Sequence, residues 1–532
     1  MTEPANAATT PERLTIPDRL NIADEFVSRP AREHPEKLAV LGSEREATYA
    51  ELERDVNRVA RALRDAGCGV GDRVLIVLPD SIEFIASFFG AAKIGAIAVP
   101  VNSFARESDY AHYVRDSGAR FAIVSAEPYP AFCGAVNHAA PKLTIVVGTR
   151  GRIEPPPHGM AVRWEDWLPA SAGGIETHAT AAKDPAFFLY TSGTGGPAKA
   201  AVHSHKDMMF TSRGFAQGVL GLRAADRVFS VSKLFFAYGL GNGMYFPFSV
   251  GAGTLLYPER PRVDDVAEFV ARYRPTVFFC VPTFYGALLR EFDAGCAMDF
   301  SSVRLAVSAG EALPAEIFNR FRNRFGIEIL DGIGSTEMLH MYLSCRPGQT
   351  RAGSCGVPVP GCDVEIRDAQ GQAVTDGGIG DLWVTGGSMF TGYWNAWQGS
   401  DARRRGEWFN TADKFVRDAD GFYRYCGRAD DMMKVSGMWV SPGEVENALL
   451  GHSAVAECAV VGRADAAGLV RPVAFVVLRD GVSAPAGGFD SELHGWLHTR
   501  LVGFKCPEEF HYVTELPKTS TGKIQRFLLR QG

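Results

Sequence analysis

The sequence lacks the features that mark membrane, secreted or nucleic-acid-binding proteins. It has no stretch of about 18 uncharged apolar residues, and its start, MTEPANAATTPERL, has no basic segment followed by an apolar core. Its net charge is −6 and it carries no long basic run, so we see no electrostatic footprint for nucleic acid or an anionic membrane. The ten cysteines stand singly, without a CxxC pair, which is typical of reduced thiols. We therefore expect a cytoplasmic protein with neither a membrane nor a nucleic acid as partner.

Length and periodicity predict an α/β protein of more than one domain. At 532 residues the chain exceeds what one hydrophobic core normally serves. Apolar strand segments such as VLIVL alternate with helical segments such as IEFIASFFGAAK, which favours helices packed on a largely parallel sheet. After about residue 360, strand-like runs are separated by glycine turns. We expect a large N-terminal domain of parallel-sheet α/β subdomains plus a small β-barrel (1–429), and a small mobile α+β C-terminal domain (430–532).

A turn rich in glycine and hydroxyl residues follows the apolar strand segment FFLY. It places Thr191, Ser192 and Thr194 among glycines, and Lys199 comes shortly after. Converging backbone N–H groups, hydroxyl donors and a lysine charge can together cradle a polyphosphate. The turn is not a Walker A loop, because Ala198 stands where that motif needs glycine and no serine or threonine follows the lysine. Taken alone, the turn fits a solvated loop about as well as a phosphate site.

The turn resembles the phosphate loop of the adenylate-forming superfamily, which includes acyl- and aryl-CoA synthetases, luciferases and nonribosomal adenylation domains. The usual pattern is aromatic-[ST]-S-G-[ST]-T-G-x-P-K-G, and this chain departs from it at Gly195, Ala198 and Ala200. Further motifs match in order: SAGEAL, LDGIGSTEM, EWFNTADKF, GRADDMMKVSGMWVSPGEVE and PKTSTGKIQR. Three stretches are most similar to benzoate-CoA ligases: KLFFAYGLGNGMYFPFSVGAGTLLYPERP, PTVFFCVPTFYGALL and ILDGIGSTEMLHMYLS. The resemblance implies an ATP-dependent ligase that activates a small aromatic acid as its acyl adenylate and transfers it to coenzyme A.

The resemblance also implies roles for the residues around the reacting phosphate. Lys523 would bridge the carboxylate and α-phosphate oxygens during adenylation, where an anion approaches a polyanion and positive charge must gather. Thr336 would hydrogen-bond the α-phosphate. Glu337 would hold Mg²⁺, a hard cation that prefers carboxylate oxygens.

The remaining nucleotide contacts follow from the same motifs. Asp413 would accept hydrogen bonds from the ribose hydroxyls, with Arg428 alongside. We expect Gly310 and Gly332 to be glycines because the nucleotide lies against the backbone there. The other ATP-binding positions implied by the resemblance are the phosphate-loop residues and those near the adenine: Thr191, Ser192, Gly193, Thr194, Lys199, Glu311, Asp331 and Ile333.

The implied acid pocket mixes flat aromatic residues with very small ones, which suits a planar ring. Its members are Ala237, Tyr238, Phe246, Ala309, Gly334, His340 and Met341. Ordinary core packing is the alternative for the aromatic residues. In resembling ligases the small domain rotates about the position of Asp430 and brings the segment 434–440 to the site. The positions of the resulting coenzyme A tunnel would be Lys434, Ser436 and Gly437, with Phe236 as its gate.

Two other functions remain open from the sequence. The same adenylation chemistry could load the acid onto a carrier-protein phosphopantetheine arm. The altered phosphate loop also allows a catalytically weak nucleotide-binding protein, although the retained Glu337, Asp413, Arg428 and Lys523 argue against it. The ring substituents of the acid are not decided by residue names, and a homodimer is one expected assembly.

Overall fold

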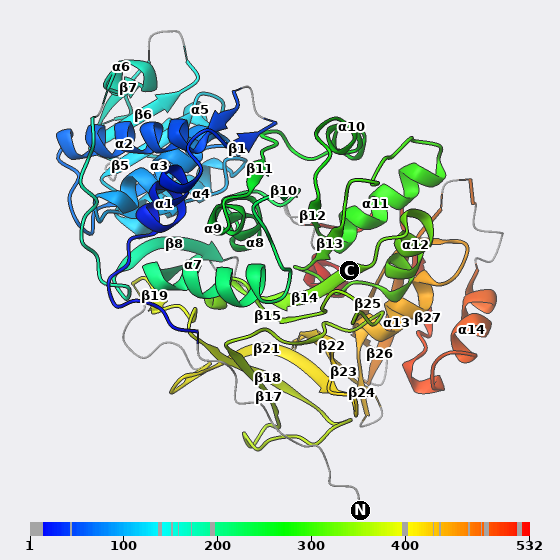
Figure 1. Cartoon of the computed structure of the whole chain (residues 1–532). Coiled ribbons are helices and arrows are strands. Elements are labelled where there is room, and N and C mark those ends of the chain that lie inside the picture. The colour runs from blue at the N-terminus through cyan, green and yellow to red at the C-terminus, as the bar shows by residue number, and fades with distance from the viewer. Residues whose placement is uncertain are drawn as a thin grey trace, which may run out of the picture.

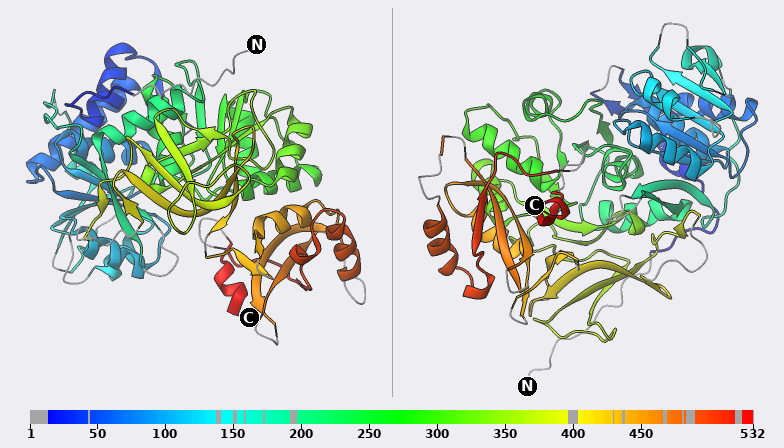
Figure 2. Two further views of the ribbon diagram at one scale, coloured as in Figure 1. Left: turned by 90° about the horizontal axis from the view of Figure 1, so that it is seen from below. Right: turned by 180° about the vertical axis from the view of Figure 1, so that it is seen from behind.

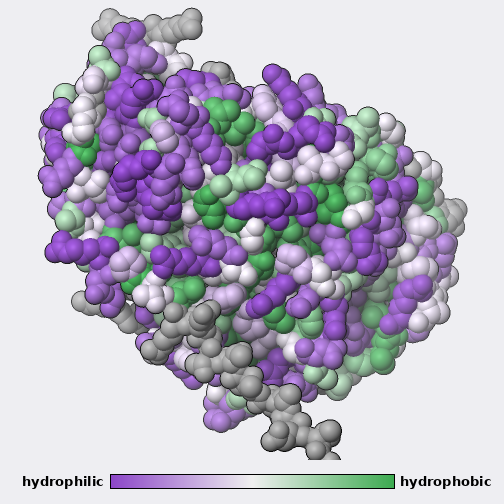
Figure 3. Space-filling model, in the orientation of Figure 1, coloured by the Kyte–Doolittle hydropathy of each residue, from purple (hydrophilic) through white to green (hydrophobic). Residues whose placement is uncertain are grey.

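The computed structural model describes residues 14–42, 45–136, 141–149, 153–157, 159–171, 173–191, 197–395, 403–428, 430–435, 438–465, 469–479, 481–482, 489–518 and 524–531. Two large mixed sheets form most of the N-terminal part, and helices cover them (Figure 1). Hydrophilic side chains cover most of the face seen in Figure 3, with smaller hydrophobic areas between them. Within the described ranges, no helix is both long and apolar enough to cross a membrane.

The 8-stranded sheet contains both flanks of the predicted phosphate loop. Its order is β19-β9-β8-β4-β3-β5-β6-β7, parallel from β8 to β7, with β9 and β19 antiparallel at one edge. Its inner strands are continuous apolar runs because a parallel sheet is buried on both faces. The strands are β3 (Arg73–Val77), β4 (Ile97–Pro100), β5 (Phe121–Ser125), β6 (Leu143–Val147), β7 (Met160–Arg163), β8 (Pro185–Thr191), β9 (Lys199–Ser204) and β19 (Gly392–Tyr393).

The 9-stranded sheet places two of the sequence motifs side by side at the carboxyl ends of its parallel strands. Its order is β16-β15-β14-β13-β12-β10-β11-β1-β2, parallel from β14 to β1. Ser308 pairs with Asp331 at the carboxyl ends of β13 and β14, so the motifs SAGEAL and LDGIGSTEM emerge side by side. The strands are β1 (Leu38–Leu41), β2 (Ala47–Thr48), β10 (Arg227–Ser230), β11 (Gly253–Leu255), β12 (Val277–Cys280), β13 (Leu305–Ser308), β14 (Ile329–Gly334), β15 (Met341–Ser344) and β16 (Val357–Pro358).

The helix pair α2 (Tyr49–Asp65) and α3 (Ile82–Lys93) shows how local sequence positions these layers. A capping box starts α2, because the Thr48 hydroxyl accepts from the Glu51 N–H while the Glu51 carboxylate accepts from the Thr48 N–H. The two helices approach closely at Gly90, where a Cβ would lie 2.8 Å from Val59 Cγ1. The other helices of this part are α1 (Arg29–Glu33), α4 (Glu107–Ser117), α5 (Tyr129–Ala135), α6 (Trp164–Trp167), α7 (His205–Thr211), α8 (Ala237–Leu240), α9 (Phe246–Ser249), α10 (Val263–Tyr273), α11 (Pro282–Asp293) and α12 (Ala315–Phe325).

An antiparallel sheet of five strands stands where the small β-barrel was predicted. Its order is β17-β18-β21-β20, and β22 also pairs with β21. Among the described residues, no strand pairing joins β17 to β20 or β22. The β22 edge instead meets residues 355–356, since Tyr423 exchanges backbone hydrogen bonds of 2.9 Å with them. The strands are β17 (Cys362–Arg367), β18 (Ile379–Gly386), β20 (Arg404–Arg405), β21 (Trp408–Arg417) and β22 (Tyr423–Arg428).

The C-terminal residues form a small α+β unit beside the larger part, as predicted (Figure 2). Strands β25, β26 and β27 make one sheet, and β23 pairs with β24. The boundary at Asp430 stays a prediction. The elements are β23 (Met433–Val435), β24 (Met438–Val440), α13 (Pro442–Leu450), β25 (Val455–Ala464), β26 (Val470–Leu478), α14 (Asp490–His498), β27 (Glu509–Tyr512) and α15 (Arg526–Gln531).

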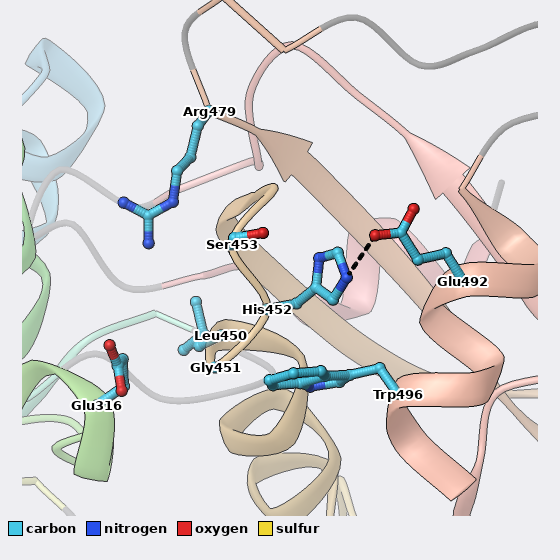
Figure 4. A pocket seen from close by; sticks show the side chains of 8 residues that line it. All are labelled: Glu316, Leu450, Gly451, His452, Ser453, Arg479, Glu492 and Trp496. Carbon is cyan, nitrogen blue, oxygen red and sulfur yellow. Dashed lines mark ion pairs between the residues drawn. The ribbon is translucent and has the colours of Figure 1, made fainter. Parts of the chain in front are cut away.

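Polar groups from both parts meet where the two parts are in contact. Arg290 of α11 forms an ion pair with Glu457 of β25 at 3.4 Å. Glu316 of α12 faces a cavity of about 550 Å³ whose other lining residues belong to the C-terminal unit. Figure 4 shows His452 directed toward Glu492, at 3.1 Å, in this cavity. An interface of this kind is easier to open than an apolar one.

Candidate active site

Strands β8 and β9 hold the two ends of the predicted phosphate loop. Thr191 and Lys199 are paired across them, so the loop starts and ends at one point. The Lys199 ammonium lies 5.3 Å from the centre of the Tyr393 ring on β19. The predicted loop residues Ser192, Gly193 and Thr194 lie outside the described residues, and their roles stay predictions.

Glu337 lies at the meeting point of three segments. It belongs to the 3-10 turn η4 (Thr336–Met338) and is only 7% exposed. The Tyr393 hydroxyl donates to its Oε1, and Arg403 Nη2 lies 3.5 Å from the same oxygen and 2.5 Å from the Tyr393 hydroxyl. The Glu337 carbonyl accepts a 2.7 Å bond from the Phe390 N–H. The carboxylate is therefore held in one position by Tyr393, whose ring also contacts Lys199, as a ligand for a hard cation must be held.

The backbone of Thr336 is anchored by a buried histidine. His203 Nε2 lies 2.8 Å from the Thr336 carbonyl oxygen, and His203 Nδ1 lies 2.9 Å from Asp207 Oδ2. His203 and Asp207 are both fully buried. This histidine thus links β9 and α7 to the turn that carries the predicted catalytic residues.

The segment between β14 and β15, which contains η4, reverses the direction of the chain. Leu339 is fully buried with φ at +65°, a conformation that a bulky side chain rarely adopts. It separates Glu337 from His340, which begins the return into β15. The strained turn therefore places the carboxylate and the imidazole in different surroundings.

His340 is the centre of an aromatic cluster. Its ring centre lies 4.5 Å from that of Phe246, 5.1 Å from that of Phe215 and 5.6 Å from that of Tyr238. Burial lowers the pKa of His340 to about 3, so the imidazole is uncharged at neutral pH. Its Nε2 lies 3.1 Å from Asn242 Oδ1.

The remaining predicted pocket residues adjoin this cluster. Gly334 pairs with Met341 across β14 and β15, and a Cβ on Gly334 would lie 2.5 Å from the His340 carbonyl oxygen. The Tyr238 hydroxyl lies 3.3 Å from the Val307 carbonyl oxygen of β13. Ala237 precedes this tyrosine on α8, and the buried Ala309 directly follows β13. The predicted pocket residues thus come from neighbouring elements, and their role in binding an acid stays a prediction.

Asp331 presents a buried carboxyl at the end of β14. Burial raises its pKa well above the ordinary value, and its Oδ1 has no hydrogen-bond partner in the described part of the chain. Ile333 and Glu311, two other predicted nucleotide contacts, are half-buried. Gly310 has φ +92°, which by itself requires glycine.

Strand packing also requires glycine at position 332, in addition to the predicted nucleotide contact. A Cβ there would lie 2.6 Å from the Leu343 carbonyl oxygen and 2.7 Å from Met341 Sδ. The pairing of β14 with β15 therefore excludes any larger residue, whether or not a nucleotide lies against this backbone.

Asp413 and Arg428 face each other on paired strands. Arg428 Nη1 donates to Asp413 Oδ1 at 3.1 Å, and their Cα atoms are paired between β21 and β22. The preceding Ala412 has φ +62°, where the resembling motif carries glycine.

The predicted hinge and tunnel residues are only partly described. Asp430 and Lys434 are exposed, and Phe236 packs edge-on against Phe235 with ring centres 4.6 Å apart. Ser436, Gly437 and Lys523 lie outside the described residues. The segment that carries Lys523 is flanked by two anchors: Lys518, 2.6 Å from Glu457, and Arg526, 2.8 Å from Glu446.

Comparison with known proteins decides the family. The model for AMP-binding enzyme matches residues 27–394, and the model for AMP-binding enzyme C-terminal domain matches residues 444–523. The chain belongs to the AMP-binding enzyme family. Benzoate–CoA ligase of Thauera aromatica is 41% identical to it over 99% of both chains.

Two solved structures show the same fold as this AMP-binding enzyme. Anthranilate CoA ligase AuaEII in complex with anthranoyl-AMP gives a TM-score of 0.90 at 37% identity, covering 97% of this chain and 98% of that one. A benzoate CoA ligase from Burkholderia xenovorans LB400 gives 0.86 at 40% identity, covering 96% and 99%. The predicted α/β fold with a large and a small domain, and the predicted likeness to benzoate-CoA ligases, are confirmed.

The motifs of this AMP-binding enzyme do not show which distant side chains contact the motif residues and hold them in place. Sequence reasoning missed Tyr393 and Arg403 beside Glu337, and Asn242 beside His340. Each lies at least 56 residues from its partner. Asn242 lies in the segment GLGNGMY, and a polar residue among apolar ones is the signal that could have indicated it.

Proposed function

We propose that this chain is an AMP-forming aryl-CoA ligase for a benzoate-type acid: benzoate, an aminobenzoate or a hydroxybenzoate. The observation that carries the proposal is a carboxylate held by Tyr393 and Arg403 three residues before a buried, uncharged aromatic cluster around His340. The first end suits a nucleotide with its metal ion, and the second suits a planar ring. The full-length likeness to a benzoate–CoA ligase supports the same class.

The proposed reaction has two steps. A carboxylate oxygen of the acid attacks the α-phosphorus of ATP, the bond from that phosphorus to the bridging oxygen breaks, and pyrophosphate leaves. The coenzyme A thiol, losing its proton, then attacks the acyl carbon, and AMP leaves with the electron pair of the broken C–O bond. The first step is opposed by charge repulsion, so positive charge and oriented donors are what the protein must supply.

Glu337 fits the role of a magnesium ligand. It is a hard oxygen donor held by two neighbours, and Mg²⁺ in nucleotide sites commonly uses one or two protein carboxylates together with phosphate oxygens. When bound, the ion would offset phosphate charge. Lys199 contacts the ring of Tyr393, and the hydroxyl of the same tyrosine bonds to Glu337. The lysine charge therefore supports phosphate binding near this carboxylate. We assign the bridging of the two reacting anions to Lys523, and hydrogen bonding of the α-phosphate to Thr336.

We assign binding of the nucleoside to two acidic residues, Asp413 on β21 and Asp331 on β14. Asp413, held by Arg428, would accept from the ribose hydroxyls. Asp331 Oδ1, which has no hydrogen-bond partner within the described residues, would accept from the adenine amino group.

The C-terminal unit is assigned to the second step. We propose that rotation about Asp430 exchanges Lys523 for the hairpin that carries Lys434, with Phe236 opening a path for the pantetheine arm. The polar contact through Arg290 and Glu457 is consistent with a unit that leaves and returns. We also propose a cytoplasmic location, where ATP and coenzyme A are available.

The test is product analysis with a panel of acids. The enzyme, ATP and Mg²⁺ are incubated with benzoate, 2-aminobenzoate, each hydroxybenzoate and cinnamate, with and without coenzyme A. We expect acid-dependent pyrophosphate exchange without coenzyme A, and AMP plus aryl-CoA with it. Formation of ADP with an active acid would contradict the proposal. Exchange without any thioester to free coenzyme A would favour a carrier-protein acceptor, and nucleotide binding without exchange would favour the weak nucleotide-binding protein.

A further inference from the structure

One face of helix α4 contacts the two strands that lead to Lys199. His112 and Asp116 are one helical turn apart on α4, so their side chains lie on the same face. His112 Nε2 lies 2.7 Å from the Ala198 carbonyl oxygen, directly before Lys199 and the start of β9. The Tyr190 hydroxyl, near the end of β8, donates to Asp116 Oδ2 at 2.9 Å. The helix therefore bonds to both of the paired strands β8 and β9.

The same helix also bonds to the segment that supplies the ring beside Lys199. Trp394 Nε1 donates to the Asp116 carbonyl oxygen at 3.0 Å. Trp394 directly follows Tyr393, whose ring centre lies 5.3 Å from the Lys199 ammonium and whose hydroxyl donates to Glu337. Helix α4 thus bonds to the start of β9, to β8 and to the end of β19, three places that determine where Lys199 lies relative to Glu337.

The chemistry of the two side-chain contacts fixes their direction. A carbonyl oxygen only accepts, so His112 Nε2 carries the hydrogen and donates to Ala198. Burial and the neighbouring Asp116 raise the pKa of Tyr190, so its hydroxyl keeps its proton and donates. Alanine stands at position 198 where the resembling loops carry proline, so the backbone before Lys199 lacks the φ restraint of a proline ring. The hydrogen bond from His112 restrains this backbone instead.

We propose that His112 and Asp116 are positioning residues that hold Lys199 in place to bind the β- and γ-phosphates of ATP. This rests on the proposed function, because it assumes that ATP binds beside Glu337. Lysine carries a point charge on a flexible four-carbon stem, so its charge acts at a set place only if the backbone that bears it is fixed. Loss of the α4 contacts should therefore weaken the binding of ATP and spare that of AMP, which lacks these two phosphates.

The experiment measures equilibrium binding of ATP and of AMP, each with Mg²⁺ and without an acid. His112→Phe keeps a ring but removes the N–H, and it should raise the Kd for ATP about five- to tenfold while the Kd for AMP stays within about twofold. His112→Gln keeps a donor and should bring the Kd for ATP back to within about threefold of wild type. Tyr110→Phe is the matched control, because the Tyr110 hydroxyl on the same helix donates to the Ser103 carbonyl oxygen at 3.0 Å. Both Kd values of this control should equal those of the wild type.

A double variant tests whether His112 acts through Lys199. Lys199→Met should weaken ATP binding, and adding His112→Phe should then change the Kd for ATP by less than about twofold. If the two effects multiply in full, His112 does not act through the lysine and the assignment is overturned. Equal loss of ATP and AMP binding in His112→Phe, or no loss of either, would overturn it as well.

Two further outcomes keep the test decisive. If His112→Phe does not fold, Tyr190→Phe removes the hydroxyl bonded to Asp116 and replaces it in every comparison, with the same expected results. If these variants contradict the inference while the wild type forms AMP and aryl-CoA from an acid, the proposed function stands. A wild-type protein that binds no ATP would overturn both.

Discussion

The two ends of the candidate site use opposite electrostatic arrangements. At Glu337, charged and polar side chains from β19, the turn η4 and Arg403 hold one another in place. At His340, burial among aromatic rings keeps a titratable group uncharged, with its pKa lowered to about 3. Only the strained Leu339 and its neighbour Met338 lie between the two residues. A reaction that joins a polyphosphate to an aromatic acid needs both environments in contact, and one tight turn provides them.

The two ends should therefore respond differently to substitution. The charged end depends on charge and on a few directed contacts, so isosteric loss of charge should affect rate more than stability. The aromatic end depends on burial, so its changes should appear in stability and selectivity. Variants at each end test this contrast through changes in rate and in stability, in decreasing order of size.

Removing the predicted catalytic cation should have the largest effect. Lys523→Ala should slow adenylation by about 10²–10³-fold, the range seen when one group that stabilises transition-state charge is lost. Thioester formation from supplied aryl adenylate should be largely spared, because the anhydride already exists. Pyrophosphate exchange and single-turnover thioester formation measure the two steps. Equal loss in both would show that the lysine has another role.

Neutralising the held carboxylate should come next. Glu337→Gln keeps the shape of the side chain and a carbonyl oxygen for Tyr393, but it removes the charge that would hold Mg²⁺. We expect about a 100-fold loss in adenylation rate, with a higher Mg²⁺ concentration needed for half-maximal rate. The unfolding midpoint should move little. A large drop in that midpoint would mean that this carboxylate is mainly structural.

Fixing the proposed hinge should affect only the second step strongly. Asp430 is exposed, so Asp430→Pro removes no buried contact, but it fixes φ near −65°. Adenylation should stay within about tenfold, or 1.4 kcal/mol in barrier terms, while thioester formation falls much further. A folded variant that makes aryl-CoA at the normal rate would rule out rotation at this residue.

The uncharged histidine predicts a pH effect on stability. The folded pKa of His340 is about 3, below the unfolded value of about 6.5, so the unfolded chain binds more protons as pH falls below about 7. Wild-type stability should therefore decrease toward low pH, and the share due to this residue at pH 5 is about 2 kcal/mol. His340→Gln does not titrate and should lose that much less between pH 7.5 and 5. Urea unfolding at both pH values measures it, and identical losses would contradict the burial argument.

The smallest effect concerns backbone strain in β21, directly before Asp413. Ala412 has φ +62°, and Ala412→Gly should raise the free energy of unfolding by about 0.5–1 kcal/mol, the relief of strain less the added entropy of the unfolded chain. Ala62→Gly within α2 is the control, and it should lower stability instead. Leu339 has a similar φ but is fully buried, so its replacement by glycine should destabilise through lost packing. No gain in Ala412→Gly would mean that neighbouring contacts hold this conformation without cost.

The sequence by itself determined the parts that depend on short-range pattern. Apolar runs and helical spacing were enough for the α/β class, and the motif order was enough for the family. The glycine at 310 follows from a backbone conformation that local sequence can encode. These features are predictable because each is written within a few consecutive residues.

Tertiary structure alone decided which distant side chains complete the site. Tyr393 and Arg403 reach Glu337 across 56 and 66 residues, and Asn242 reaches His340 across 98. No local periodicity records such pairs, because they depend on how β19, the π-helical turn η3 (Gly241–Tyr245) and β14 are arranged in space. For the same reason the sequence could not show what borders the small antiparallel sheet: the edge of β22 pairs with residues 355–356, and only the packed sheets show that this partner is available.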